Sequence, residues 1–223
     1  MTFEEYADQE MLAIDLANTL AGELENALFN HEFASLVVPG GTTPGNVFDA
    51  LCGADLDWSR VHVMLTDERW VPEGHPRSNG GLVRERLLTN RAAAAKFIPF
   101  YREGMTPDEA APEVAAVVKG ELPISVLLLG MGEDMHTASL FPGAQGFKQA
   151  MAADAPLVCP IYTQDQEEPR LTLSAEVLDG AMAKHLAIYG QAKRDALERA
   201  INLPEIEAPI AAVMGEGTVH WAA

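Results

Sequence analysis

The chain has 223 residues, of which 48% are hydrophobic and 22% charged, and this composition is typical of a folded globular protein rather than a disordered one. Its net charge is −18, and the first 59 residues hold eleven acidic residues but no lysine or arginine. A surface of this sign repels nucleic acids and anionic membranes, which excludes proteins that bind by neutralising many phosphates at once.

The first part of the chain predicts three helices with strands between them. Apolar residues recur with helical spacing over residues 3–29 and predict a long amphipathic helix with an acidic outer face. A short β-type run at residues 36–38 stops at a Pro-Gly-Gly turn. A helix is expected from Pro44, because proline is tolerated in the first helical turn. Residues 61–65 (VHVML) predict a buried strand, and a helix is expected over residues 79–88 after a polar loop.

The rest of the chain continues the alternation of strands and helices. Helices are expected over residues 107–119 and 191–201. Strands are predicted at residues 124–129, 157–158, 171–173, 185–189, 210–213 and 219–221. The run ISVLLL at residues 124–129 is continuously apolar, which suits a parallel strand covered on both faces. We therefore expect one α/β domain over residues 1–223, with an open, mostly parallel sheet and helices on both faces.

The first of three unusual loops is a Gly-Gly-Thr-Thr-Pro turn between a strand and a helix. Ligands of such sheets bind outside the carboxyl ends of the strands, where this turn is expected to lie. Gly40 and Gly41 allow backbone N–H groups to approach an anion, Thr42 and Thr43 offer hydroxyls, and the helix start supplies about half a positive charge. The turn predicts a phosphate cradle, and its alternative is a tight turn with a threonine cap.

The second loop places two acids and a base directly after a predicted strand. Asp67 and Glu68 can act as acids, bases or orienting groups, and Arg69 can hold an anionic oxygen. The alternative is a solvated ion pair at the start of a loop. Ser78 and Asn79 follow as a predicted helix cap, for which a second role is also open.

The third loop follows the most apolar strand and contains a carboxylate and an imidazole two residues apart. Its Gly130-x-Gly132 start is not a dinucleotide fingerprint, because Met135 stands where the third glycine would be. In the Asp134-x-His136 pair, an imidazole of pKa ~6.5 can accept a proton from water while the carboxylate holds its other nitrogen. The alternative for this histidine is an ordinary surface side chain.

The remaining chemistry-bearing residues predict structural roles. Cys52 and Cys159 are far apart and belong to no metal-ligand pattern, so both are expected to be small buried hydrophobic residues. No convergent ligand set predicts a metal site. No basic, apolar signal peptide and no apolar run of ~20 residues is present, so a soluble cytoplasmic protein is expected. The other histidines are expected to be structural: His31, His62, His75, His185 and His220.

Five runs together resemble the 6-phosphogluconolactonase family, in the same order and over nearly the whole chain. They are VVPGGTTP (37–44), TDERWVPEGHPRSN (66–79), LLLGMGEDMHTASLFPG (127–143), PRLTLS (169–174) and GQAKRDAL (190–197). The resemblance implies a Rossmann-like α/β fold and the hydrolysis of 6-phosphoglucono-lactone to 6-phosphogluconate without a cofactor. It implies a small phosphorylated sugar lactone as the partner, and a monomer or weak homo-oligomer is expected.

The resemblance also carries over site residues one position at a time. It implies that His136 is the general base with Asp134 beside it, and that Asp67 and Arg69 belong to the active site. The phosphate and substrate contacts that it implies are Gly40, Gly41, Thr42, Thr43, Arg170 and Lys193. Two positions depart from the family pattern. Pro39 stands where serine is common, and Met135 stands where glycine is common, so Met135 is strained if its φ is positive.

Two alternative functions are separated by single features. The related amino-sugar-6-phosphate deaminases carry Asn-Glu-Pro where this chain has Leu140-Phe141-Pro142, so the acid that helps to open a sugar ring is missing. A non-catalytic sugar-phosphate sensor is the other alternative. The acidic amino-terminal part and the lack of a basic helix-turn-helix segment argue against a DNA-bound sensor.

Overall fold

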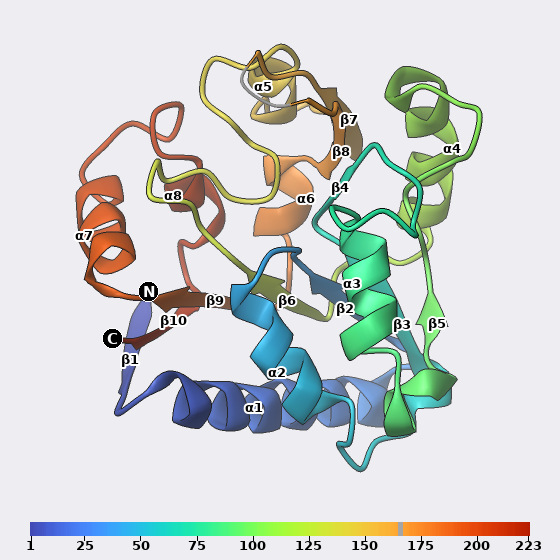
Figure 1. The fold of residues 1–223 in the computed structure, drawn as a ribbon, viewed down its shortest axis with the longest axis vertical. Coiled ribbons are helices and arrows are strands. Elements are labelled where there is room, and N and C mark those ends of the chain that lie inside the picture. Colours follow the sequence, from blue (N-terminus) through green and yellow to red (C-terminus); the bar gives the residue numbers. More distant parts are fainter. Residues whose placement is uncertain (165–166) are drawn as a thin grey trace.

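A seven-stranded, entirely parallel sheet forms the centre of the molecule (Figure 1). The computed structural model describes residues 1–164 and 167–223. In spatial order the strands are β1 (Thr2–Tyr6), β10 (Thr218–Ala222), β9 (Ala183–Tyr189), β6 (Val126–Leu129), β2 (Ala34–Val38), β3 (Val61–Leu65) and β5 (Lys96–Phe97). The central strands β2 and β6 are buried along their whole length. This is the α/β architecture predicted from the alternating pattern.

Helices cover the sheet from opposite sides. In Figure 1, α1 runs below the sheet, and α6 and α8 lie above it. The helices are α1 (Gln9–Asn30), α2 (Thr43–Leu51), α3 (Asn79–Arg86), α4 (Pro107–Lys119), α5 (Phe147–Ala150), α6 (Ala175–Asp179), α7 (Gln191–Ala200) and α8 (Pro209–Val213). Short 3₁₀ turns occupy Trp58–Arg60 and Asn90–Ala94. Among the described helices, none is long and apolar enough to cross a membrane.

A second, antiparallel sheet stands next to the first and brings distant segments together. Its strands, in spatial order, are β4 (Asp67–Arg69), β8 (Arg170–Leu173) and β7 (Val158–Ile161). β4 follows β3 almost directly, and pairing with β8 sets Asp67 opposite Thr172 and Arg69 opposite Arg170. The sequence pattern predicts a loop for the segment that begins with Asp67. It is a strand because β8, about 100 residues later in the chain, satisfies its backbone.

Two element predictions were wrong. Residues 3–6 belong to the edge strand β1, which pairs with β10, and the first helix begins only at Gln9. The Asp8 side chain caps that helix by accepting a hydrogen bond from the Met11 N–H at 2.8 Å. Residues 210–213 form the helix α8, with Pro209 in its first turn, instead of a strand. A short apolar run does not distinguish the two structures by periodicity.

Most other predicted elements are confirmed. The predicted strand at residues 61–65 and the predicted helix at residues 107–119 agree with β3 and α4 at both ends. Cys52 and Cys159 are free and buried, as expected. No sequence pattern predicts β5, α5 or α6, because these elements have only two to five residues each.

Candidate functional site

A cavity of about 250 Å³ opens at the carboxyl edge of the central sheet. All three loops singled out in the sequence contribute to its wall, as expected for the edge where parallel strands end. Nine of the ten residues predicted for the site line it: Gly40, Gly41, Thr42, Thr43, Asp67, Arg69, His136, Arg170 and Lys193. The tenth, Asp134, lies behind His136 and lines an adjoining cavity of about 430 Å³ together with it.

The Gly-Gly-Thr-Thr turn joins β2 to α2 and presents polar groups to the cavity. Thr42 occupies the N-cap position of α2, but its side chain makes no capping hydrogen bond. The threonine cap expected in the alternative interpretation of this turn is therefore absent. Gly41 has a φ of +92°, which favours glycine. At Gly40, a Cβ atom would lie 1.8 Å from the amide oxygen of Asn79, so only glycine fits against that side chain.

Lys193 brings an ammonium group to the same cavity from the first turn of α7. The side chain is half-buried, and among the residues that the structure describes it makes no hydrogen bond or ion pair. Burial lowers the pKa of Lys193, and the nearby Glu133 carboxylate opposes that effect. A half-buried cation that makes no hydrogen bond is a ready contact for an anionic ligand.

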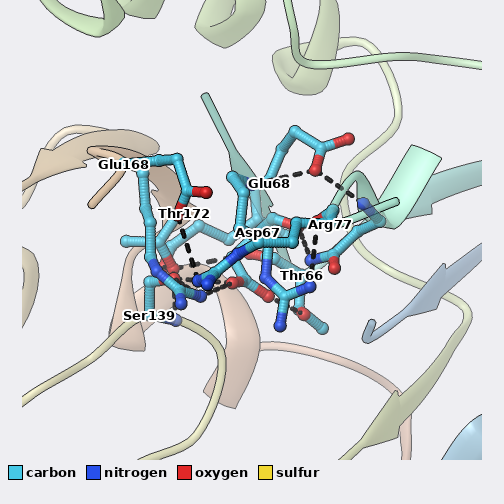
Figure 2. A network of polar contacts seen from close by, with 11 residues as sticks. Thr66, Asp67, Glu68, Arg77, Ser139, Glu168 and Thr172 are labelled. Carbon is cyan, nitrogen blue, oxygen red and sulfur yellow. Dashed lines mark hydrogen bonds and ion pairs between the residues drawn. The ribbon is translucent and has the colours of Figure 1, made fainter. Parts of the chain in front are cut away.

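Asp67 and Arg170 belong to a buried polar cluster at the junction of the two sheets. Figure 2 shows Asp67 in this cluster with Thr66 and Ser139. Asp67 is 4% exposed and accepts hydrogen bonds from the hydroxyls of Thr66 at 2.8 Å and Ser139 at 2.6 Å. Arg170 Nη1 lies 3.6 Å from Asp67 Oδ2 and 3.5 Å from Ser139 Oγ. Burial lowers the pKa of Arg170, and the Asp67 carboxylate opposes this shift. Asp67 thus fixes the Arg170 guanidinium at the cavity wall.

A second arginine reaches the cavity from β4. Arg69 Nη1 donates a hydrogen bond to the backbone carbonyl of Arg77 at 2.9 Å. Arg77 in turn forms an ion pair with Glu168 at 3.0 Å (Figure 2). Arg69 is therefore held at the cavity wall by its backbone in β4 and by this loop contact.

His136 and Asp134 form the pair that their spacing predicted. His136 Nδ1 lies 2.5 Å from Asp134 Oδ1, and this hydrogen bond is the main reason that the pKa of Asp134 is lowered. Gly132 lies directly beneath the two side chains, because a Cβ atom there would be 2.3 Å from the carboxylate and 2.4 Å from the ring. The second glycine of this loop thus makes room for the pair instead of serving a dinucleotide.

The loop around His136 is held in an uncommon backbone conformation. Met135 has a φ of +66° and Ala138 a φ of +49°. A non-glycine residue in this region costs about 1–2 kcal/mol. The strain predicted for Met135 in the case of positive φ is therefore present, directly before the histidine, as is common at functional sites.

Phe141 separates the imidazole from the buried arginine. Its ring centroid lies 4.2 Å from that of His136 and 5.2 Å from the Arg170 guanidinium carbon. This aromatic residue takes the place of the acid that the sequence comparison with deaminases found missing. The part of the site nearest His136 is therefore apolar on one side.

The predicted cap at Ser78 is confirmed, but sequence reasoning did not specify the contacts of three other residues around the cavity. Glu68, Asn79 and Ser139 are all almost fully buried and hydrogen-bonded to other site residues. All three stand inside the runs that carry the family resemblance. The signal for their location was thus present, but their contacts depend on tertiary pairing. No cluster of potential metal ligands occurs among residues 1–164 and 167–223.

Comparison with known families and proteins gives a consistent result. A family model described as glucosamine-6-phosphate isomerases/6-phosphogluconolactonase matches residues 7–221. A 6-phosphogluconolactonase of Pseudomonas aeruginosa is 44% identical over 92% of this chain and 88% of its own length. A 6-phosphogluconolactonase of Mesorhizobium japonicum is 41% identical over 97% of this chain and 93% of its own.

The fold is also similar to that of a solved structure. The crystal structure of a 6-phosphogluconolactonase from Shewanella baltica superimposes with a TM-score of 0.96 at 33% identity. It covers 100% of this chain and 98% of its own.

Proposed function

Because this chain belongs to the glucosamine-6-phosphate isomerase/6-phosphogluconolactonase family, we propose that the cavity at its carboxyl edge is the site of lactone hydrolysis. The reaction converts 6-phospho-D-glucono-1,5-lactone to 6-phospho-D-gluconate, a step of the oxidative pentose phosphate pathway, and it is the activity of this chain. It requires a phosphate-binding region, a general base and a donor for the oxyanion, and residues of the cavity can supply each of them.

The observation that carries the assignment is the half-buried Lys193 ammonium in the same cavity as the Gly40–Thr43 turn. The turn offers N–H groups and hydroxyls but no charge, and Lys193 offers a charge that makes no hydrogen bond among the described residues. A phosphate between them satisfies both, and Arg170 adds a second cation to the cavity lining. Binding energy from this remote phosphate holds the lactone carbonyl in place for reaction.

His136 activates the attacking water. Its Nδ1 is occupied by Asp134, and the lowered pKa of that carboxyl keeps it ionised and able to accept the Nδ1–H bond. Nε2 is then left with a lone pair that can take a proton from water. The hydroxide adds to the lactone carbonyl and forms a tetrahedral oxyanion. The imidazolium Nε2–H then protonates the ring oxygen as the ester bond breaks.

The developing oxyanion needs a donor that is already in place. Arg69 lines the cavity and supplies such a donor, whereas the N–H groups of the glycine turn hold the phosphate. Phe141 packs against His136 at the position where the deaminases carry a glutamate, so the site lacks the extra acid of these ring-opening enzymes.

The test is the variant His136→Ala, with His31→Ala as its matched control on the exposed end of α1. Loss of a general base lowers turnover by about 10²–10⁴-fold. We expect kcat to fall by that order with KM nearly unchanged, after the spontaneous hydrolysis rate is subtracted, and His31→Ala to retain full activity. If His136→Ala keeps half of the wild-type kcat, His136 is not the base.

We further propose that residues 1–223 act as one domain, in the cytoplasm, as a monomer or weak homo-oligomer. The family model spans residues 7–221, and residues that line the cavity come from positions 39 to 193. Both observations support one functional unit. Analytical ultracentrifugation over a range of protein concentrations tests the oligomeric state.

A further inference from the structure

Glu68 is buried directly between two residues that line the cavity. It is 2% exposed and is the middle residue of β4. Successive side chains of a strand point to opposite faces. Asp67 and Arg69 accordingly line the cavity, whereas Glu68 turns to the other face, toward the start of α3.

The Glu68 carboxylate occupies the amino end of α3 in the way that a bound anion would. Oε1 accepts hydrogen bonds from the backbone N–H groups of Arg69 at 2.8 Å and Asn79 at 2.7 Å. Oε2 accepts one from the Gly80 N–H at 2.8 Å and one from the Ser78 hydroxyl at 3.2 Å. These donors satisfy N–H groups that a helix start leaves without intrahelical partners. Burial raises the pKa of Glu68 to about 7, against the lowering effect of the same N–H donors.

Through Asn79, this anchor reaches the phosphate cradle. The Asn79 side chain donates a hydrogen bond to the Asp67 carbonyl at 2.8 Å. Its amide oxygen lies where a Cβ atom of Gly40 would be. A displacement of Asn79 therefore pushes on Gly40 or leaves it unsupported.

We propose that Glu68 is a positioning residue for the phosphate half of the cavity, which sets Arg69 through its backbone and the glycine turn through Asn79. This inference rests on the phosphate site proposed above. The contacts of Glu68 do not extend to Asp134 or His136, which stand on the separate loop after β6. Loss of the anchor consequently affects substrate binding more than proton transfer.

The test is the variant Glu68→Gln, assayed for KM and kcat separately. A carboxamide has one acceptor oxygen, and its NH₂ group would face backbone N–H donors, so at least one of the anchoring hydrogen bonds is lost. We expect KM to rise by about 5- to 10-fold, the effect of losing one or two hydrogen bonds. Because Arg69 is also the proposed oxyanion donor, we expect kcat to fall as well, by a smaller factor than KM rises.

The matched control is Glu121→Gln. Glu121 is also buried, at 6% exposure, and its carboxylate contacts His62 at 2.6 Å and Lys96 at 3.3 Å. It lies at the opposite edge of the sheet, after α4 and before β6. We expect Glu121→Gln to lower the free energy of unfolding without changing KM.

A second variant, Gly80→Ala, keeps the test valid if Glu68→Gln does not fold. Its Cβ atom would lie 3.0 Å from Glu68 Oε2 and would crowd the carboxylate without removing it. We expect a smaller rise in KM than in Glu68→Gln. An unchanged KM in whichever of the two variants folds overturns the inference, and so does a fall in kcat at constant KM.

The charge-removing variant Lys193→Met separates this inference from the phosphate site on which it rests. If Lys193→Met raises KM and Glu68→Gln does not, the phosphate site stands and the positioning role of Glu68 is wrong. If Lys193→Met itself leaves KM unchanged, the proposed phosphate site is wrong.

Discussion

Removing the charge of Lys193 is the sharpest single test of how this site holds a phosphate. Methionine keeps the volume of the aliphatic stem and deletes only the ammonium group. A hydrogen bond between charged groups contributes about 1.5–3 kcal/mol, which corresponds to a roughly 10- to 150-fold change in affinity. Since Lys193 is half-buried, salt screens this contact less than a surface pair. Arg170 and the backbone donors remain in Lys193→Met, so we expect KM to rise by about 10- to 100-fold.

Lys193→Met is expected to weaken substrate binding without lowering the stability of the fold. Burial lowers the pKa of Lys193 in the folded protein, which means that folding disfavours its charged form. Removing the charge is therefore expected to leave the free energy of unfolding unchanged or to raise it. The combination of weaker substrate binding and undiminished stability separates a ligand-binding cation from a structural one.

The assay compares lactone hydrolysis above the spontaneous rate, at several ionic strengths, with urea unfolding of the same preparations. The control is Lys119→Met, an exposed lysine in the last turn of α4, at the edge of the sheet opposite the cavity. We expect kcat of Lys193→Met to stay near the wild-type value, because contacts equal in the ground and transition states change KM alone. A KM rise below about 3-fold, or a clear loss of stability, would refute the reasoning.

Two further predictions concern buried or strained residues near the edges of the sheet. Burial and, to a lesser degree, the neighbouring His185 lower the pKa of His220 to about 4, whereas Asp15 opposes the shift. Because the unfolded chain binds this proton below about pH 6.5 and the folded one does not, the free energy of unfolding falls by about 3 kcal/mol between pH 6.5 and 4. Urea unfolding of His220→Asn should lack this part of the pH dependence, and parallel curves for the two proteins would contradict it. At Met135, where φ is +66°, glycine should be more stable than alanine by about 1 kcal/mol, the reverse of the usual order, as measured by urea unfolding of both variants.

The parts of the site that the sequence predicts best are local. The Gly40–Thr43 turn and the Asp134–His136 pair each lie within a few residues, directly after an apolar strand. Their geometry follows from the strand end and the glycines, so residue spacing alone was sufficient to predict that these residues lie together at the edge of the sheet. The reason for a glycine at position 132 could not be predicted in this way. Only the structure shows that the Asp134 and His136 side chains occupy the space that a Cβ atom of residue 132 would need.

The parts that depend on distant pairing could not be derived from spacing. Arg170 reaches the cavity only because β8 pairs with β4, which places Arg69 and Arg170 opposite each other. A three-residue strand is too short to show a periodicity that predicts such a pairing. Only the family resemblance indicated that Arg170 and Lys193 belong to the site. The same limit explains the first helix, where Phe3 and Tyr6 matched helical spacing while their backbone pairs with β10.

The distribution of the net charge of −18 along the chain determines which elements can bring positive charge to the cavity. Residues 1–59 contain the whole glycine turn but no lysine or arginine, so the turn can supply only N–H groups, hydroxyls and the partial charge of a helix start. Full positive charge has to arrive from β4, β8 and α7, through Arg69, Arg170 and Lys193. An anion that is small enough to touch all of these elements at once gains from each of them. A long polyanion touches mainly the acidic surface and is repelled, so the same charge distribution that excludes nucleic acids favours one compact phosphate.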